Sequence, residues 1–274
     1  TGLLDLLILW RAERAKAAPP PALLAAFAQK AESALRAIDA EIDAIADVLW
    51  TPSADADENL AGEGVAAERI DLIGNIMIDS FEMLRDKIDA STTRSDLGLK
   101  DKQYGLVTLH RPSNVDQAET LTPIVEALTT AAKDLPLVFV AHPRTIASLE
   151  KLGLKDKLTA NGNIQLLEPL PYIKFMNVVT GSKVVITDSG GLQEETTYLD
   201  IPCLTMRENT ERPEGIAAGT SELVGTSASR IVAAASRLLT DSAEYARRAQ
   251  LRNPYGDGTA AGKIARMLEA ELNH

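Results

Sequence analysis

Short runs of β-branched and aliphatic residues alternate along most of the chain with longer stretches in which apolar residues recur at helical spacing. The runs predict buried strands, among them residues 104–110, 137–141 and 184–187. The longer stretches predict helices, among them residues 117–133 and 172–180. Strands and helices that alternate through short loops are typical of a parallel sheet with helices on both faces. The sequence therefore predicts an α/β fold with a doubly wound parallel sheet.

The remaining predicted elements continue the alternation. Further strands are predicted at residues 48–51, 70–74, 164–166, 202–206 and 222–224. Further helices are predicted at residues 55–63, 76–88, 145–152, 227–241 and 259–272, and another opens at Leu192. Residues 91–102 are polar and predict a linker.

Residues 1–46 differ from this pattern. A helical stretch with a charged end and a second, Ala-rich amphipathic stretch are separated by three prolines at residues 19–21, which predicts a helical hairpin. Such regularity is typical of a structural cap or of a designed segment, and no group in it suggests chemistry.

Composition narrows the classes of partner. The 274-residue chain has a formal net charge of −11, which argues against nucleic acid, and no cluster of Lys or Arg suggests an anionic membrane. The single cysteine, Cys203, lies in an apolar run and is expected to be a buried structural thiol. No 18-residue apolar span and no signal-peptide pattern is found, so a cytoplasmic location is expected.

One turn in the chain combines the features of a phosphate site. Residues 184–187 predict a strand that ends at Asp188, and Ser189, Gly190 and Gly191 lead into the next helix. Free backbone N–H groups at a helix start attract phosphate, and glycines allow its oxygens to approach. Ser189 adds a hydroxyl, and Glu195, about one turn later, is placed to accept from a ribose diol. The alternative is a tight turn in which Ser189 only caps the helix.

Four other loops carry polar side chains next to predicted elements. Residues 110–111 (His-Arg) and 142–144 (His-Pro-Arg) follow predicted strands, and ligands of parallel sheets bind at the carboxyl ends of strands. Residues 168–172 form a rigid Pro-rich loop that could border a base. Residues 211–214 place three charges around a proline. Taken singly, each is equally well explained as an ordinary turn or a solvated loop.

Six segments, taken together and in order, resemble the non-hydrolysing UDP-N-acetylglucosamine 2-epimerases. They are Leu-His-Arg-Pro-Ser-Asn-Val-Asp (109–116), Ala-His-Pro-Arg (141–144), Leu-Glu-Pro-Leu-Pro-Tyr (167–172), Thr-Asp-Ser-Gly-Gly-Leu-Gln-Glu-Glu (187–195), Arg-Glu-Asn-Thr-Glu-Arg-Pro-Glu (207–214) and Asn-Pro-Tyr-Gly-Asp-Gly (253–258). The similarity runs from about Ile45 to Met267. The resemblance implies two Rossmann-like domains in the GT-B arrangement, with a UDP-sugar in the cleft between them.

The resemblance also implies roles for individual residues. His110 is the candidate catalytic residue, close to the diphosphate. The candidate UDP-binding residues are Arg111, Tyr172, Phe175, Ser189, Gly190, Gly191 and Glu195, with Leu170 to Phe175 bordering the uracil. Glu211 and Arg212 are the candidates for the sugar side. No cofactor and no metal is expected.

The chain departs from the family pattern in its first part. A complete family member begins with a Gly-Thr-Arg-Pro-Glu turn and later has His-Gly-Asp and His-Val-Glu-Ala-Gly-Leu-Arg segments, which supply the carboxylates assigned to proton transfer. None of these is found, and residues 1–41 stand in their place. We therefore expect a truncation or a chimaera, with a hairpin at residues 1–46, a remnant of the first Rossmann-like domain at 47–90 and a UDP-binding domain at 103–274.

The sequence thus predicts a family member that binds UDP or UDP-N-acetylglucosamine with little or no turnover, as a monomer or homodimer. Family chemistry removes the C2 proton while UDP leaves on the opposite face, which requires both a base and an acid. Two alternatives remain open. One is an engineered scaffold without a ligand, and the other is an active epimerase that uses other carboxylates, such as Asp5, Glu13 or Asp39.

Overall fold

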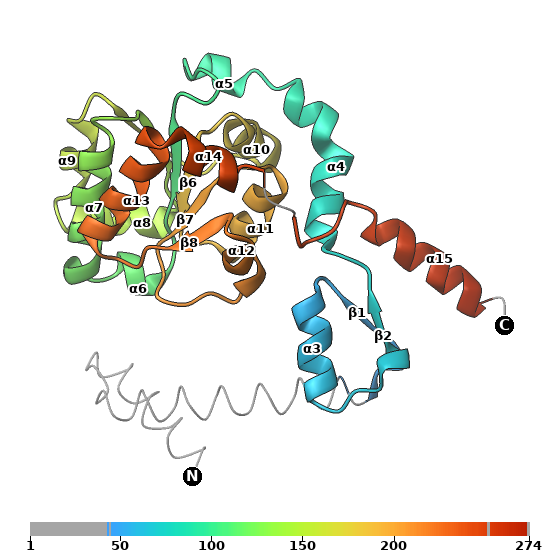
Figure 1. Ribbon diagram of the computed structural model, residues 1–274. Coiled ribbons are helices and arrows are strands. Elements are labelled where there is room, and N and C mark those ends of the chain that lie inside the picture. The colour runs from blue at the N-terminus through green and yellow to red at the C-terminus, as the bar shows by residue number, and fades with distance from the viewer. Residues whose placement is uncertain (1–42, 44, 251–252, 273–274) are drawn as a thin grey trace, which may run out of the picture. The chain divides into compact units, whose positions relative to one another are not determined.

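The computed structural model describes residue 43, residues 45–250 and residues 253–272 of the chain (Figure 1). The hairpin predicted for residues 1–46 therefore lies almost entirely outside the described residues. The chain divides into two compact units. The smaller unit consists of residues up to Thr51 together with Ala56–Leu72, and the larger unit consists of Pro52–Asp55 and residues 73–274.

The smaller unit contains a pair of parallel strands. They are β1 (Leu49–Thr51) and β2 (Ile70–Leu72), with Leu49 opposite Ile70, and α3 (Ala54–Gly62) and the short helix η1 (Ala67–Arg69) connect them. The predicted strands at 48–51 and 70–74 are confirmed. Trp50 and Leu72 remain partly exposed, whereas residues on parallel strands are usually covered on both faces.

The larger unit is built on a six-stranded sheet in which every pair of strands is parallel. Its strands, in chain order, are β3 (Gly105–Thr108), β4 (Leu137–Val140), β5 (Ile164–Leu167), β6 (Val184–Thr187), β7 (Cys203–Thr205) and β8 (Ser221–Leu223). In the sheet they lie in the order β5-β4-β3-β6-β7-β8. All six occur where apolar runs predicted them.

Helices precede the sheet, connect its strands and follow it in the chain. They are α4 (Ile76–Asp89), α5 (Thr93–Asp96), α6 (Pro112–Val115), α7 (Ala118–Ala131), α8 (Pro143–Lys151), α9 (Lys155–Thr159), α10 (Tyr172–Thr180), α11 (Gly190–Tyr198), α12 (Pro213–Ala218), α13 (Ala228–Thr240), α14 (Ser242–Arg248) and α15 (Ala260–Leu272). The short helices α5, α6, α9, α12 and α14 were not predicted, because one or two turns are too short to establish a helical period.

Two apolar clusters, one on each face, sandwich the sheet. On one face α7, α8, α9 and α13 pack on side chains such as Val107, Phe139 and Ile186. On the other face α4, α10 and α11 pack on Leu106 and Val185. Adjacent residues of one strand, such as Leu106 and Val107, thus point into different clusters, as the period of a strand requires. The predicted doubly wound α/β architecture is confirmed.

The strand order reverses direction between β3 and β6. From β3 the chain adds β4 and β5 on one side, and from β6 it adds β7 and β8 on the other. The loops that leave β3 and β6 therefore diverge to opposite sides, and a crevice opens at the carboxyl ends of the two strands. This reversal places the loops at His110 and Ser189 side by side.

Helix α4 belongs to the larger unit. The sequence-based division had instead grouped it with β1 and β2, in a domain of residues 47–90. The buried Asn177 of α10 ties this segment down, since its amide donates to Ile88 O (2.9 Å) and accepts from Arg94 N (3.0 Å). Asp79 of α4 accepts from the amides of Ala260 and Ala261 and so caps α15.

Among the described residues, no helix is long and apolar enough to cross a membrane.

The packing of α7 against α13 gives a stability prediction. Leu128 of α7 is fully buried in the first cluster, so Leu128→Ala should lower the free energy of unfolding by about 2–5 kcal/mol through lost burial and a residual cavity. The exposed Thr130 on the same helix is the control, and Thr130→Ala should change it by less than about 0.5 kcal/mol. Urea unfolding of both variants measures the difference, and equal losses would contradict this description of the core.

Candidate functional site

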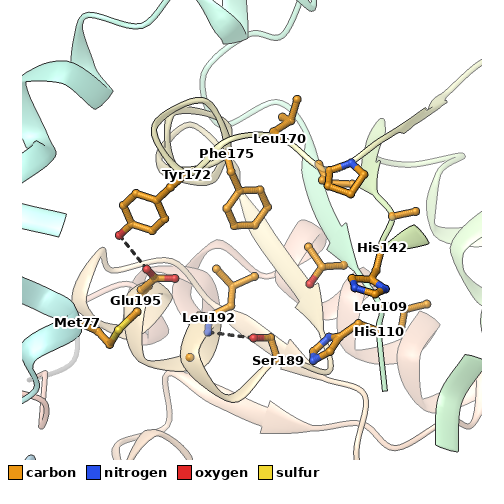
Figure 2. A pocket seen from close by; sticks show the side chains of 15 residues that line it. Met77, Leu109, His110, His142, Leu170, Tyr172, Phe175, Ser189, Leu192 and Glu195 are labelled. Carbon is orange, nitrogen blue, oxygen red and sulfur yellow. Dashed lines mark hydrogen bonds between the residues drawn. The ribbon is translucent and has the colours of Figure 1, made fainter. Parts of the chain in front are cut away.

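Three loops meet at the carboxyl ends of neighbouring strands. His110 follows β3, His142 follows β4 and Ser189 follows β6, and these strands lie side by side in the order β4-β3-β6. Figure 2 shows the two imidazoles on one side of a pocket, Tyr172 and Glu195 on the opposite side, and Ser189 beside His110. The sequence-based prediction that these loops gather at one edge of the sheet is confirmed.

The pocket at this edge has a volume of about 380 Å³, within the range of small-molecule sites. It is lined by Met77, Thr108, Leu109, His110, Val140, Ala141, His142, Pro169, Leu170, Tyr172, Phe175, Ser189, Gly191, Leu192 and Glu195. Most of this lining is apolar, and a few polar groups converge on the cavity from different elements. That combination is typical of a site that binds a ligand with both a planar and a charged part.

Ser189 is the N-cap residue of α11. Its hydroxyl oxygen accepts from Leu192 N (3.4 Å), and its own amide donates to the Thr187 hydroxyl (3.0 Å). Because the oxygen is the acceptor in the cap, its hydrogen is free to be donated into the pocket. The capping role and the binding role, which were alternatives in the sequence, are therefore compatible.

The two glycines at the start of α11 face different surroundings. A Cβ on Gly191 would meet nothing within 4 Å, and Gly191 lines the pocket. A Cβ on Gly190 would lie 2.6 Å from Glu211 Oε1, so this glycine makes room for a protein carboxylate. Gly191 leaves the helix N-terminus open to the cavity, where an anion is favoured by free N–H groups and by the helix dipole.

A buried carboxylate holds the loop after β3. Asp188 has no exposed surface, and its oxygens accept from the amides of His110 (3.1 Å) and Arg111 (2.9 Å), from Asn114 Nδ2 (3.1 Å) and from His110 Nδ1 (2.8 Å). Burial acts to raise the pKa of Asp188, but the bonds from His110 and Arg111 hold it below its usual value. Asp188 is therefore an ionised acceptor at neutral pH.

The predicted sugar-side residues, Glu211 and Arg212, form separate ion pairs and lie outside the pocket lining. Arg111 Nη2 donates to Glu211 Oε1 (2.9 Å), and Arg207 also pairs with Glu211. Arg212 pairs with the buried Glu194. Burial raises the pKa of Glu194, partly offset by the Arg212 charge.

Glu195 is a buried carboxyl on the pocket wall. It accepts a hydrogen bond from Tyr172 Oη (3.0 Å), and 6% of its surface is exposed. Burial raises the pKa of Glu195 to about 7, the Tyr172 bond lowers it and the charge of Glu194 raises it. The group therefore changes its charge close to neutral pH, and its ionised form is suited to accept from a hydroxyl pair.

The structure thus sorts the predicted site residues into two groups. His110, Tyr172, Phe175, Ser189, Gly191 and Glu195 line one cavity, whereas Arg111, Gly190, Glu211 and Arg212 lie outside its lining. The prediction did not include Met77 of α4, nor the strand-end residues Thr108 and Val140. Met77 lies in residues 74–79, a segment that also resembles the family, but its place in the lining follows from the packing of α4 and was not predicted.

Comparisons with known proteins identify the family. The family model described as UDP-N-acetylglucosamine 2-epimerase matches residues 32–269. The chain is 34% identical over 231 residues to the UDP-N-acetylglucosamine 2-epimerase of Methanocaldococcus jannaschii, which covers 82% of this chain and 62% of that protein. It is 36% identical over 237 residues to the enzyme of Campylobacter jejuni, which covers 83% of this chain and 61% of that protein.

Solved structures give the same result. The M. jannaschii UDP-GlcNAc 2-epimerase in complex with UDP-GlcNAc and UDP has a TM-score of 0.72 at 32% identity, over 82% of this chain and 61% of that one. The Neisseria meningitidis UDP-GlcNAc 2-epimerase bound to UDP-GlcNAc has a TM-score of 0.74 at 28% identity, over 83% of this chain and 62% of that one. The chain therefore spans about three fifths of the length of the relatives it matches.

Glu195 gives a prediction that needs no ligand. Its carboxyl binds a proton on folding between its ordinary pKa of 4.5 and its folded value of about 7, so the folded state loses stability as pH rises through this window. Relative to Glu195→Gln, the wild type should lose on the order of 1–3 kcal/mol of unfolding free energy between pH 4.5 and 7.5. Urea unfolding across that range measures it. Parallel stability curves for the two proteins would show that Glu195 titrates normally.

Proposed function

This chain belongs to the UDP-N-acetylglucosamine 2-epimerase family, and we propose that it binds UDP or a UDP-sugar in the cavity between β3 and β6, with little or no epimerase turnover of its own. The observation that carries the proposal is the convergence of three kinds of group on one cavity. An open helix N-terminus, a buried carboxylate and an apolar wall suit, respectively, a diphosphate, a ribose diol and a base.

The diphosphate is assigned to the start of α11. The free amides beside Gly191 and the Ser189 hydroxyl are its donors, and the His110 imidazole approaches it from β3. Arg111 adds a guanidinium on the same loop, held towards Glu211 (2.9 Å). Gly190 supports this site indirectly, because its lack of a side chain gives the Glu211 carboxylate its place.

The nucleoside is assigned to the other end of the cavity. Glu195 accepts from the ribose diol, and Tyr172 holds its carboxyl in place (3.0 Å). Leu170, Phe175 and the β4 residue Val140 belong to one apolar cluster and form the surface on which uracil packs. Glu211 and Arg212 are assigned to the sugar side, where their charges border the outer end of the diphosphate site.

Low turnover is proposed from the chemistry that the reaction requires. Epimerisation at C2 needs a base on one face of the carbon and an acid on the other, and each contributes typically 10²–10⁴-fold. Glu195 is the carboxylate in the described lining, and it is assigned to the ribose. The segments that carry the proton-transfer carboxylates in the resembled family were not found in this sequence. The proposal concerns this chain, which spans about three fifths of its relatives.

Titration with UDP tests the binding proposal. UDP at about 100 times its dissociation constant should stabilise the fold by about 2.7 kcal/mol and raise its melting temperature, since it binds the folded chain alone. Calorimetry and thermal unfolding measure this, with uridine as the control that lacks the diphosphate. Absence of any shift at millimolar UDP would favour a scaffold without ligand function.

Deuterium exchange at C2 of UDP-N-acetylglucosamine, followed by NMR, detects turnover, and rapid exchange would contradict the low-turnover proposal.

Gly191 provides the sharpest variant for the phosphate assignment. Gly191→Val places a side chain in the space proposed for the diphosphate, so UDP affinity should fall at least tenfold while the fold is kept, because a Cβ there meets no atom within 4 Å. Gly262→Val, on the exposed side of α15, is the matched control and should bind UDP like the wild type. Unchanged affinity in Gly191→Val would place the diphosphate elsewhere.

A further inference from the structure

We propose that Asp188 is a positioning residue that holds His110 with its hydrogen on Nδ1, so that Nε2 takes up a proton from solvent when an anionic ligand binds. The ligand named here, a diphosphate, rests on the proposed function. The state of the imidazole itself does not, because it follows from contacts within the ligand-free chain.

The contact between the two side chains defines the tautomer. His110 Nδ1 lies 2.8 Å from Asp188 Oδ1. An ionised carboxylate accepts hydrogen bonds and has none to donate, so the hydrogen between these atoms must belong to Nδ1. A neutral imidazole carries one hydrogen, and Nε2 is therefore left with its lone pair.

The surroundings of Asp188 keep it ionised and immobile. The Arg111 amide (2.9 Å) and Asn114 Nδ2 (3.1 Å) both donate to Oδ2, and the His110 amide lies 3.1 Å from each oxygen. Asn114 is itself fixed by a bond to Met206 O (2.9 Å). The carboxylate thus has one orientation, and it presents Oδ1 to the imidazole.

The other edge of the ring is available to a ligand. His110 lines the pocket, and 44% of its side-chain surface is exposed although its partner Asp188 is fully buried. Because Nδ1 faces Asp188, Nε2 is directed away from it. A fully ionised phosphate oxygen has no hydrogen to share with a lone pair, so close approach requires a proton on Nε2. That proton comes from solvent, and the resulting imidazolium lies between two anions.

The other charged groups near His110 largely compensate one another. Arg111 on the same loop is paired with Glu211 (2.9 Å), which also pairs with Arg207. On the β4 side, the Arg144 guanidinium donates to Asp116 (2.7 Å). The His142 ring lies 6.5 Å from the His110 ring, and Glu195 lies on the opposite wall of the pocket. Asp188 is the one carboxylate that the described contacts place against the His110 ring.

His142 provides an internal reference for the tautomer. It is the N-cap of α8, and its Nδ1 accepts from Arg144 N (3.2 Å). A nitrogen that accepts a hydrogen bond carries no hydrogen, so neutral His142 must be protonated on Nε2. The two imidazoles at the pocket are therefore expected in opposite tautomers.

Nitrogen-15 NMR of histidine-labelled full chain tests the first part directly. The chain has three histidines, and His110→Gln and His142→Gln identify two of the signals by their loss. Neutral His110 should show a protonated Nδ1 and an unprotonated Nε2, and His142 the reverse. An Nε2-protonated His110, or an averaged mixture, would overturn the proposal. This measurement uses the wild type, so it does not depend on whether an Asp188 variant folds.

Asp188→Asn tests the coupling to binding. In the wild type, the Arg111 amide and Asn114 Nδ2 both donate to Asp188 Oδ2, so the side-chain oxygen of the asparagine should take the place of Oδ2. The asparagine NH₂ group then faces His110 Nδ1 and donates to it. Nδ1 therefore has to be the unprotonated nitrogen, and the hydrogen of the neutral ring moves to Nε2. The neutral ring then donates from Nε2 without taking up a proton. Because the wild type then takes up one proton more than the variant on binding, the ratio of wild-type to variant UDP affinity should fall as pH rises, by at most tenfold per pH unit. Calorimetry in buffers of different ionisation enthalpy should show fewer protons taken up by the variant.

Asn114→Ala is the matched control, since it removes one hydrogen bond to the same carboxylate and leaves Oδ1 for His110. It should keep the wild-type tautomer and proton uptake. If Asp188 had only a structural role, both variants would lower UDP affinity equally at every pH, and the proposal would be wrong. If the wild type does not bind UDP, the proposed function fails, while the NMR spectra still decide the role of Asp188.

Discussion

The pairing of β3 with β6 is the constraint on which the site depends. The two strands lie parallel with Thr108 opposite Thr187, and their hydroxyls are 2.6 Å apart at the carboxyl ends. Because the chain builds the sheet outward in opposite directions from this pair, the loops that follow the two strands separate, and the space between them cannot be filled by a neighbouring connection. The cavity follows from topology, and the loop sequences supply its chemistry.

Several side chains at this edge serve the fold and the cavity together. Ser189 caps α11 through its oxygen while its hydrogen is left for a ligand, and Asp188 fixes the loop after β3 through the same carboxylate that orients His110. Glu195, whose pKa burial raises to about 7, also forms part of the cavity wall. A substitution at any of these positions therefore alters both the fold and the cavity, which is why paired controls are needed to separate the two effects.

Much of the fold could be predicted, because apolar runs and helical spacing report burial directly, and strand ends in a parallel sheet must meet at one edge. The short helices α6, α12 and α14 could not, since they are shorter than the window of about 11–18 residues over which helical spacing can be recognised. Contacts between distant segments were also missed. The approach of Met77 and the placement of Glu211 beside Gly190 both depend on side-chain packing between separate elements. Asp188 was visible as an acidic residue at a strand end, but its partners were not.

A crystal structure of this chain with UDP tests the central claim most directly, namely that the crevice between β3 and β6 holds a nucleoside diphosphate. The account predicts the diphosphate at the start of α11 beside Ser189 and Gly191, the ribose on Glu195 and the uracil against Phe175. It also predicts His110 Nε2 within hydrogen-bonding distance of a phosphate oxygen. UDP bound at another surface, or a diphosphate remote from α11, would contradict it.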